Sequence, residues 1–136
     1  MKSPEAAMRA VLLQNSAVAA VVGTRVFPVL APAKAALPFI TYRRTGVSRE
    51  QTFSGPMGVA TTTLDMDIFA VTYEEARNLA DLCRLALDGW GGTLENTEVK
   101  RVSLESESDG FALLQGNESP PSYSVTQTYN ALWQES

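Results

Sequence analysis

The chain of 136 residues contains no histidine and only one cysteine. Without histidine, Ser-His-Asp and Cys-His catalytic arrangements cannot form within one chain, and the commonest general base and metal ligand at neutral pH is missing. The single cysteine, Cys83, excludes an internal disulfide and fits a reducing compartment. No apolar run reaches the roughly 18 residues of a membrane span, so we expect no contact with a membrane.

Signals for export and for phosphate binding are missing as well. Pro4 and Glu5 stand where a secretory signal would need a basic segment and a long apolar core, so a cytosolic origin is expected. No phosphate-binding or dinucleotide-binding glycine pattern occurs, because Gly89, Gly91 and Gly92 follow a predicted helix instead of opening one. Cys83 lies on the apolar stripe of that helix, which predicts a buried, inert thiol. The sequence therefore predicts no cofactor, no metal and no enzyme.

The composition is that of an ordinary folded domain, with 45% hydrophobic and 19% charged residues. The length matches one domain over residues 1–136. The net charge of −4 is distributed unevenly. Residues 1–60 hold seven basic and two acidic side chains, whereas residues 61–136 hold four and thirteen. Two interpretations stay open: chance clustering on a solvated surface, or basic and acidic patches that meet across a self-association interface.

Three helical segments are indicated by their capping residues. Ser3 and Pro4 begin the first helix, because serine caps a helix end and proline fits the first helical position. A second short turn over residues 17–22 is closed by Gly23. Thr72 and Glu75 form a capping box, which opens the most strongly patterned helix, ending at residues 88–89.

Strands are predicted over residues 25–29, 37–44, 59–71, 99–107 and 123–133. In the third, Leu64, Met66 and Ile68 share one face and Asp65 and Asp67 share the other. Residues 45–58 and 108–121, which hold several glycines and prolines, are predicted as long loops. The fold class is therefore α+β, a mostly antiparallel sheet of four to five strands with helices on one face, in the order α-β-β-β-α-β-β.

Several residues are candidates for contact with other protein surfaces. Asp65 and Asp67 share a strand face, but no third ligand is suggested by spacing, so solvated or interface-facing carboxylates are favoured over a metal site or an acid/base pair. Phe69 and Trp133 have two possible interpretations: they are exposed apolar anchors of an interface, or helix and sheet together cover them. The basic residues at the start of the first long loop favour docking onto an acidic neighbour over nucleic-acid binding. The interface candidates are Arg43, Arg44, Arg49, Phe53, Asp65, Asp67, Phe69 and Trp133.

The order of these motifs resembles the tail completion, or tail terminator, proteins of long-tailed bacteriophages and phage-like particles. The resemblance begins in the segment AVLLQNSAVAAVVGTRVFPVLAPAKAALPFITYRR, where residues 21–28 and 37–40 are similar to family motifs. The segment LDMDIFAVTYEEARNLADLCRLALDGW resembles the family's strand and the helix that covers its sheet. The long last strand, with Tyr129 and Trp133, is also similar, so the resemblance spans about residues 6–133.

The resemblance implies a structural role without catalysis. Family members form a ring, usually a homohexamer, that caps the finished tail tube and joins it to the head-tail connector. The expected partners are thus copies of this chain, the tail tube protein, the connector protein, and DNA that passes through the ring without sequence-specific binding. The expected location is the tail or neck of a virion assembled in the bacterial cytoplasm. An acidic bore would suit DNA passage, and the acidic surplus after residue 60 would supply it.

Two other functions are weighed beside this one. A neck or head-tail adaptor of similar architecture would occupy another level of the particle. A small enzyme would have to use Asp65, Asp67 or a tyrosine as its acid/base group. Position in the particle and ring copy number distinguish the ring from the adaptor. Replacement of both aspartates by asparagine distinguishes the enzyme from both, because it should destroy any such activity and leave assembly intact.

Overall fold

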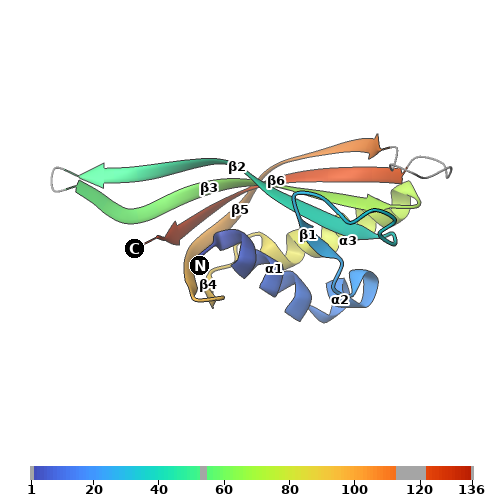
Figure 1. Cartoon of the computed structure of the whole chain (residues 1–136), viewed down its shortest axis with the longest axis horizontal. Helices are drawn as coiled ribbons and strands as arrows, with labels where there is room; N and C mark the ends of the chain where they lie inside the picture. The colour runs from blue at the N-terminus through green and yellow to red at the C-terminus, as the bar shows by residue number, and fades with distance from the viewer. Residues whose placement is uncertain (1, 53–54, 113–121, 136) are drawn as a thin grey trace.

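The computed structural model describes residues 2–52, 55–112 and 122–135 (Figure 1). Three helices and six strands follow one another within these residues. Their order is α1 (Pro4–Gln14), α2 (Ser16–Val22), β1 (Val26–Pro28), β2 (Phe39–Thr52), β3 (Gly55–Ala70), α3 (Tyr73–Leu87), β4 (Gly92–Leu94), β5 (Thr97–Ala112) and β6 (Ser122–Gln134). The α+β class is confirmed, but the expected four to five strands were too few. The expected order omitted β4, and it did not count the predicted turn over residues 17–22, which is α2, as a separate helix.

All six strands form one sheet in the order β1-β2-β3-β6-β5-β4. The four long central strands are antiparallel to their neighbours, whereas β1 pairs with β2 in parallel over three residues. The sheet is therefore mixed, although mostly antiparallel as expected. β6, the last of the described strands, lies between β3 and β5. The strands on its two sides are therefore joined into one sheet only when this C-terminal segment has folded.

Each helix begins at the kind of residue that the sequence indicates. The Ser3 hydroxyl accepts a hydrogen bond from the amide of Ala6, and Pro4 follows in the first turn. The Asn15 side chain caps α2 in the same way. At α3, Thr72 accepts from the amide of Glu75 at 3.1 Å. These side chains accept hydrogen bonds from amides that have no partner within the helix. Each of the three helices therefore begins at its capping residue.

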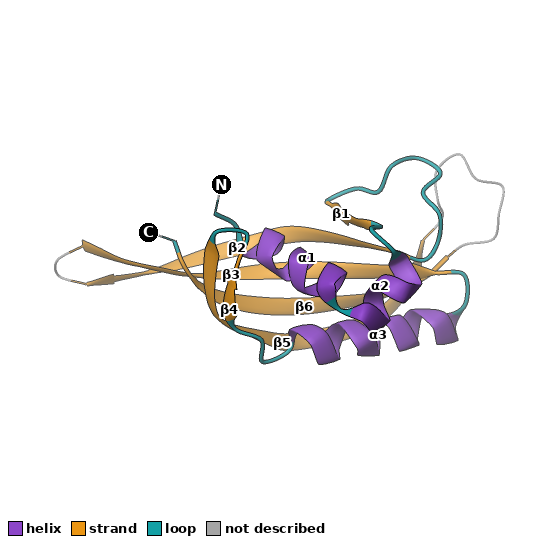
Figure 2. Ribbon diagram, turned by 90° about the horizontal axis from the view of Figure 1, so that it is seen from below, coloured by secondary structure: helices purple, strands orange, loops and turns teal. Residues whose placement is uncertain are grey.

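The three helices lie against one face of the sheet (Figure 2). The core between the two layers follows the predicted alternation, because Leu64, Met66 and Ile68 of β3 all point toward the helices and are fully buried. Leu79 and Cys83 of α3 meet this face from the other side. Small residues on α3, such as buried Ala76 and Ala80, leave room for the helix to approach the sheet. The described helices leave the opposite face of the sheet uncovered (Figures 1 and 2).

The segment predicted as a long loop over residues 45–58 instead continues both strands. β2 runs to Thr52 and β3 starts at Gly55, so the two form a long hairpin that projects beyond the helical layer (Figure 1). Gly46 lies at an irregularity in the register, where Arg44 faces Leu64 but Gly46 faces Thr63. Glycine within a strand often marks such a bulge, so its presence did not end the strand.

The second predicted loop was also too long, because β5 continues to Ala112. Two bulges in β5, between Val99 and Arg101 and between Leu104 and Ser106, change which residues face the helices. Val99 and Val102 are consequently both buried in the core, although they are three residues apart in one strand. The turn before β4 approaches β5 so closely that a Cβ on Gly91 would lie 2.6 Å from a backbone oxygen, which requires glycine there.

Candidate assembly surfaces

The uncovered face of the sheet is lined mainly by hydroxyl and carboxylate side chains. On β3 and β6 the cross-strand pairs on this face bring Asp65 beside Thr128 and Asp67 beside Thr126. The Thr128 hydroxyl donates to Asp65 at 2.8 Å, and the Thr126 hydroxyl donates to Asp67 at 2.5 Å. Threonine is a good strand former and holds its hydroxyl in a fixed direction, so this ladder orients both carboxylates.

Asp65 also has a basic neighbour. Arg43 of β2 contacts Asp65 at 3.4 Å from the neighbouring strand. No group of three or more potential metal ligands occurs among the described residues. Burial raises the pKa of the Cys83 thiol to about 12, so this group is protonated at neutral pH. Asp65 and Asp67 are both partly exposed, and their role at an interface stays a prediction.

An aromatic cluster closes one end of the uncovered face. The rings of Phe39 and Phe69 lie 5.0 Å apart, and Phe27 packs edge-on against Phe39 at 6.1 Å. Phe69 is thus partly covered by neighbouring rings, and Phe39 is only 4% exposed. Aromatic pairs at these separations stabilise the sheet beyond the area they bury.

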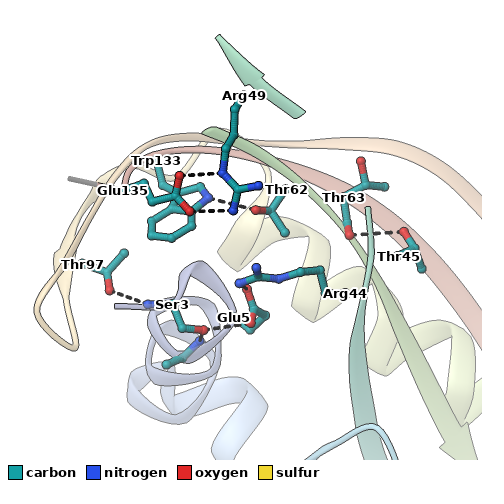
Figure 3. Close-up of polar contacts among 11 residues, drawn as sticks. Ser3, Glu5, Arg44, Thr45, Arg49, Thr62, Thr63, Thr97, Trp133 and Glu135 are labelled. Atoms are coloured by element: carbon teal, nitrogen blue, oxygen red, sulfur yellow. Dashed lines mark hydrogen bonds and ion pairs between the residues drawn. The ribbon is translucent and has the colours of Figure 1, made fainter. Parts of the chain in front are cut away.

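Trp133, the other aromatic candidate, faces the core. Its side chain is 2% exposed, and its indole N–H donates to the Thr62 hydroxyl at 2.9 Å (Figure 3). The interpretation of Trp133 as an exposed anchor is therefore wrong for the single subunit, and coverage by helix and sheet applies instead. Phe53, a further candidate, lies outside the described residues.

The basic candidates all lie on β2 and contact acidic side chains from distant parts of the chain. Arg44 pairs with Glu5 of α1 at 2.7 Å, and Arg49 forms two contacts of 2.7 and 2.8 Å with Glu135 (Figure 3). The hydrogen bond with Arg49 lowers the pKa of Glu135. Arg43 and Arg49 keep more than half of their side-chain surface exposed. Exposed ion pairs of this kind contribute little to stability, so these arginines can exchange partners.

An acidic run, Glu105, Glu107 and Asp109, and several aromatic side chains form a surface at the far end of β5. Asp109 accepts a hydrogen bond from the Tyr73 hydroxyl at 2.8 Å, which raises the tyrosine pKa, and Arg77 contacts both Glu107 and Asp109. Phe111 is 72% exposed, and the rings of Tyr73 and Tyr123 pack edge-on. Phe111 fell in a predicted loop, which hid its position in register with Tyr123 on β6.

A buried polar network connects this end of the molecule to the core. Gln127 of β6 is fully buried and donates to the backbone oxygen of Ala80 on α3 at 2.9 Å. Its amide also lies 3.3 Å from the Glu107 carboxylate. The Tyr129 hydroxyl in turn donates to the Gln127 side-chain oxygen at 2.7 Å. The network fixes α3 relative to β5 and β6, because a buried amide that lost these partners would carry a large penalty.

None of the described helices is long and apolar enough to cross a membrane.

Comparisons with known proteins assign the chain to a family. No curated protein is similar enough in sequence to count as a match. Among solved structures, a chain from the virion of a native gene transfer agent particle is similar with a TM-score of 0.77 and 16% identity, covering 97% of this chain and 95% of that one. The sequence profile of the tail completion protein gp17 family matches residues 6–119. The chain therefore belongs to the tail completion protein gp17 family and is a structural protein of a phage or phage-like tail.

Proposed function

We propose that this protein forms a ring, of hexameric size, that terminates the tail tube and joins the tail to the head-tail connector. The observation that carries the proposal is the family match over residues 6–119, most of the chain. The two-layer architecture supports it, because one face of the sheet is covered by helices and the other is left as a broad polar surface (Figure 2). A subunit of an assembly uses such surfaces, whereas an enzyme needs a convergent set of reactive groups.

The polar face is the surface best suited to line the bore through which DNA passes. Its threonine and serine hydroxyls are neutral, and the Arg43 charge is neutralised by Asp65 at 3.4 Å. DNA binds tightly where several lysines or arginines neutralise its phosphates. A lining of hydroxyls and carboxylates holds DNA only weakly and so allows it to move.

The hairpin of β2 and β3 is proposed to reach a neighbouring subunit or the tube below. Figure 1 shows the described part of the hairpin extending well beyond the helices, where another subunit could meet it. Replacing residues 51–56 with Asn-Gly keeps a turn that favours hairpins but shortens the projection. We expect a folded monomer, judged by circular dichroism and thermal melting, that no longer supports tail joining. Normal joining by this variant would refute the role of the hairpin.

Particles produced without this chain test the proposed function itself. In electron micrographs we expect overlong tails, or completed tails that are not joined to heads, and we expect the intact gene supplied separately to restore normal particles. Tails of normal length that lack only their heads, together with a ring at another level of the neck, would favour an adaptor. Normal, joined particles without the chain would refute both roles.

A further inference from the structure

The two outermost long strands of the sheet leave most of their edges without a neighbouring strand. β1 pairs with β2 only at residues 40–42, and β4 pairs with β5 only at residues 97–99. Beyond these points, β3 is the one described strand that pairs with residues 43–49 of β2, and β6 is the one that pairs with residues 105–111 of β5, so the outer edge of each segment has no neighbouring strand. Each open stretch is about seven residues, or roughly 24 Å, which is the length of an ordinary strand. Such an edge can accept a strand from another chain, and the charged side chains along it restrict which strand can pair there.

Backbone alternation shows which groups β2 offers at its edge. The Ile40 amide donates to Arg25 and the Tyr42 carbonyl accepts from Val29, so both residues direct their backbone groups away from β3. Every second residue of a strand does the same. The bulge between Arg44 and Gly46 adds one residue, so the alternation continues at Arg44, then at Val47 and Arg49.

The open edge of β5 follows from the same alternation. Val102 exchanges backbone hydrogen bonds with Trp90 and Gly89, so its backbone groups point away from β6. The Leu104 amide points the same way and donates to the Asp88 carboxylate at 3.0 Å. After the bulge between Leu104 and Ser106, the outward backbone groups belong to residues 107, 109 and 111.

The two open edges carry opposite charges. Residues 43–49 include three arginines and no acidic residue, whereas residues 105–111 include Glu105, Glu107 and Asp109 and no basic residue. The basic residues of the first half of the chain and the acidic residues of the second half thus lie on different strands, β2 and β5, at opposite sides of the sheet (Figure 2). Contact between two β2 edges would place arginine against arginine, so the charges favour contact between unlike edges.

We propose that the open edge of β2 in one copy pairs with the open edge of β5 in the next copy, so that the sheet continues from subunit to subunit. β2, β3, β6 and β5 alternate in direction, so β5 runs opposite to β2. Rotation about an axis close to the strand direction preserves that relation, and the junction is then antiparallel. A contact between two different surfaces, repeated by a rotation that divides a full turn evenly, closes a ring. This inference rests on the proposed ring and assigns its junction.

Charge reversal on each edge tests the pairing. One variant carries Arg43→Glu and Arg49→Glu, so both of its edges are acidic; the other carries Glu105→Lys and Asp109→Lys, so both are basic. Matched controls reverse an exposed charge outside the open edges, Lys34→Glu for the first and Glu98→Lys for the second. Thermal melting first confirms that all four proteins fold.

Incorporation into particles is then measured in cells that supply each variant in place of the native chain. We expect each edge variant alone to be incorporated at least about tenfold less than the native chain, because like charges meet at every junction. Co-expression of the two should restore incorporation, since acidic and basic subunits can alternate around a ring with an even number of copies. The two control variants should behave as the native chain.

Two results would overturn the junction while leaving the ring intact: native incorporation of the folded edge variants, or failure of the pair to rescue each other. Hydrogen exchange gives an independent readout. The amides of Val47, Arg49 and Asp109 should become protected when free subunits enter the assembly, and continued fast exchange in an assembled ring would also refute the pairing. If the native chain neither enters particles nor associates with itself, the proposed function fails together with the junction.

Discussion

Tyr129→Phe is the sharpest test of the buried network that fixes α3 above the acidic end of β5. The substitution removes one oxygen from a fully buried ring and leaves the ring packing in place. The lost hydroxyl donates to the Gln127 side-chain oxygen at 2.7 Å. Gln127 remains anchored to the backbone oxygen of Ala80 at 2.9 Å, so it cannot turn freely toward another donor.

The expected loss of stability comes from the Gln127 side-chain oxygen, which is left buried without its hydrogen-bond donor. A buried acceptor that loses its only donor costs about 1–3 kcal/mol, more than the net value of an ordinary hydrogen bond. The volume change is that of a single oxygen atom, so a cavity adds little. We therefore expect the free energy of unfolding to fall by about 1–3 kcal/mol. For a urea slope of about 2 kcal/mol/M, the midpoint moves down by roughly 0.5–1.5 M.

Urea unfolding followed by circular dichroism measures this change, and Tyr73→Phe is the matched control. Tyr73 also donates its hydroxyl to a side chain, Asp109, but at the exposed surface, so its loss should leave the midpoint unchanged within error. Adding Gln127→Leu to Tyr129→Phe should recover part of the lost stability, because the stranded amide is then gone. Equal midpoints for Tyr129→Phe and Tyr73→Phe would refute the reasoning.

Three further predictions address the thiol, the helix cap and the polar face. Cys83 should resist an aromatic disulfide reagent at pH 8 until the protein unfolds, because a pKa of about 12 leaves roughly one thiolate in 10⁴; rapid labelling of the folded protein would contradict its burial. Thr72→Ala should lower the free energy of unfolding by about 1 kcal/mol, since the amide of Glu75 loses its acceptor, whereas Thr72→Ser should retain most of it; equal urea midpoints for the two variants would argue against the cap. Asp65→Asn with Asp67→Asn should leave folding and particle yield unchanged, because amide oxygens still accept from the threonine hydroxyls, whereas lysine at both positions should reduce DNA delivery by assembled particles. Particle loss in the asparagine variant would show that the charges themselves hold the assembly together.

Local patterns predicted the elements whose determinants are close together in the chain. The capping box at Thr72 and Glu75 localised the start of α3, since both partners lie within one turn. The strict alternation of β3 predicted which side chains are buried, because successive residues of a strand point to opposite faces. The candidate arginines were also found from the sequence, as a cluster of charge in one segment.

Errors arose where the physical cause is distant in the sequence. Gly46 and Gly110 indicated loops, but both lie in strands whose hydrogen bonds come from partners that the local sequence does not reveal. β4 is only three residues long and exists because its turn packs closely on β5. Trp133 has an aromatic side chain that suits either face, and the register of β6 between β3 and β5 decided that it is buried.

The sequence by itself determined the absence of histidine chemistry, the helix starts, the α+β class and the separation of basic from acidic residues along the chain. These properties depend on composition or on residues a few positions apart. Only the tertiary structure decided where that charge lies. Insertion of β6 between β3 and β5 places β2 and β5 at opposite sides of one sheet, and bulges set which backbone groups each edge presents. Both depend on pairing between segments far apart in the chain, because a strand's partner and register are fixed by burial across the whole sheet.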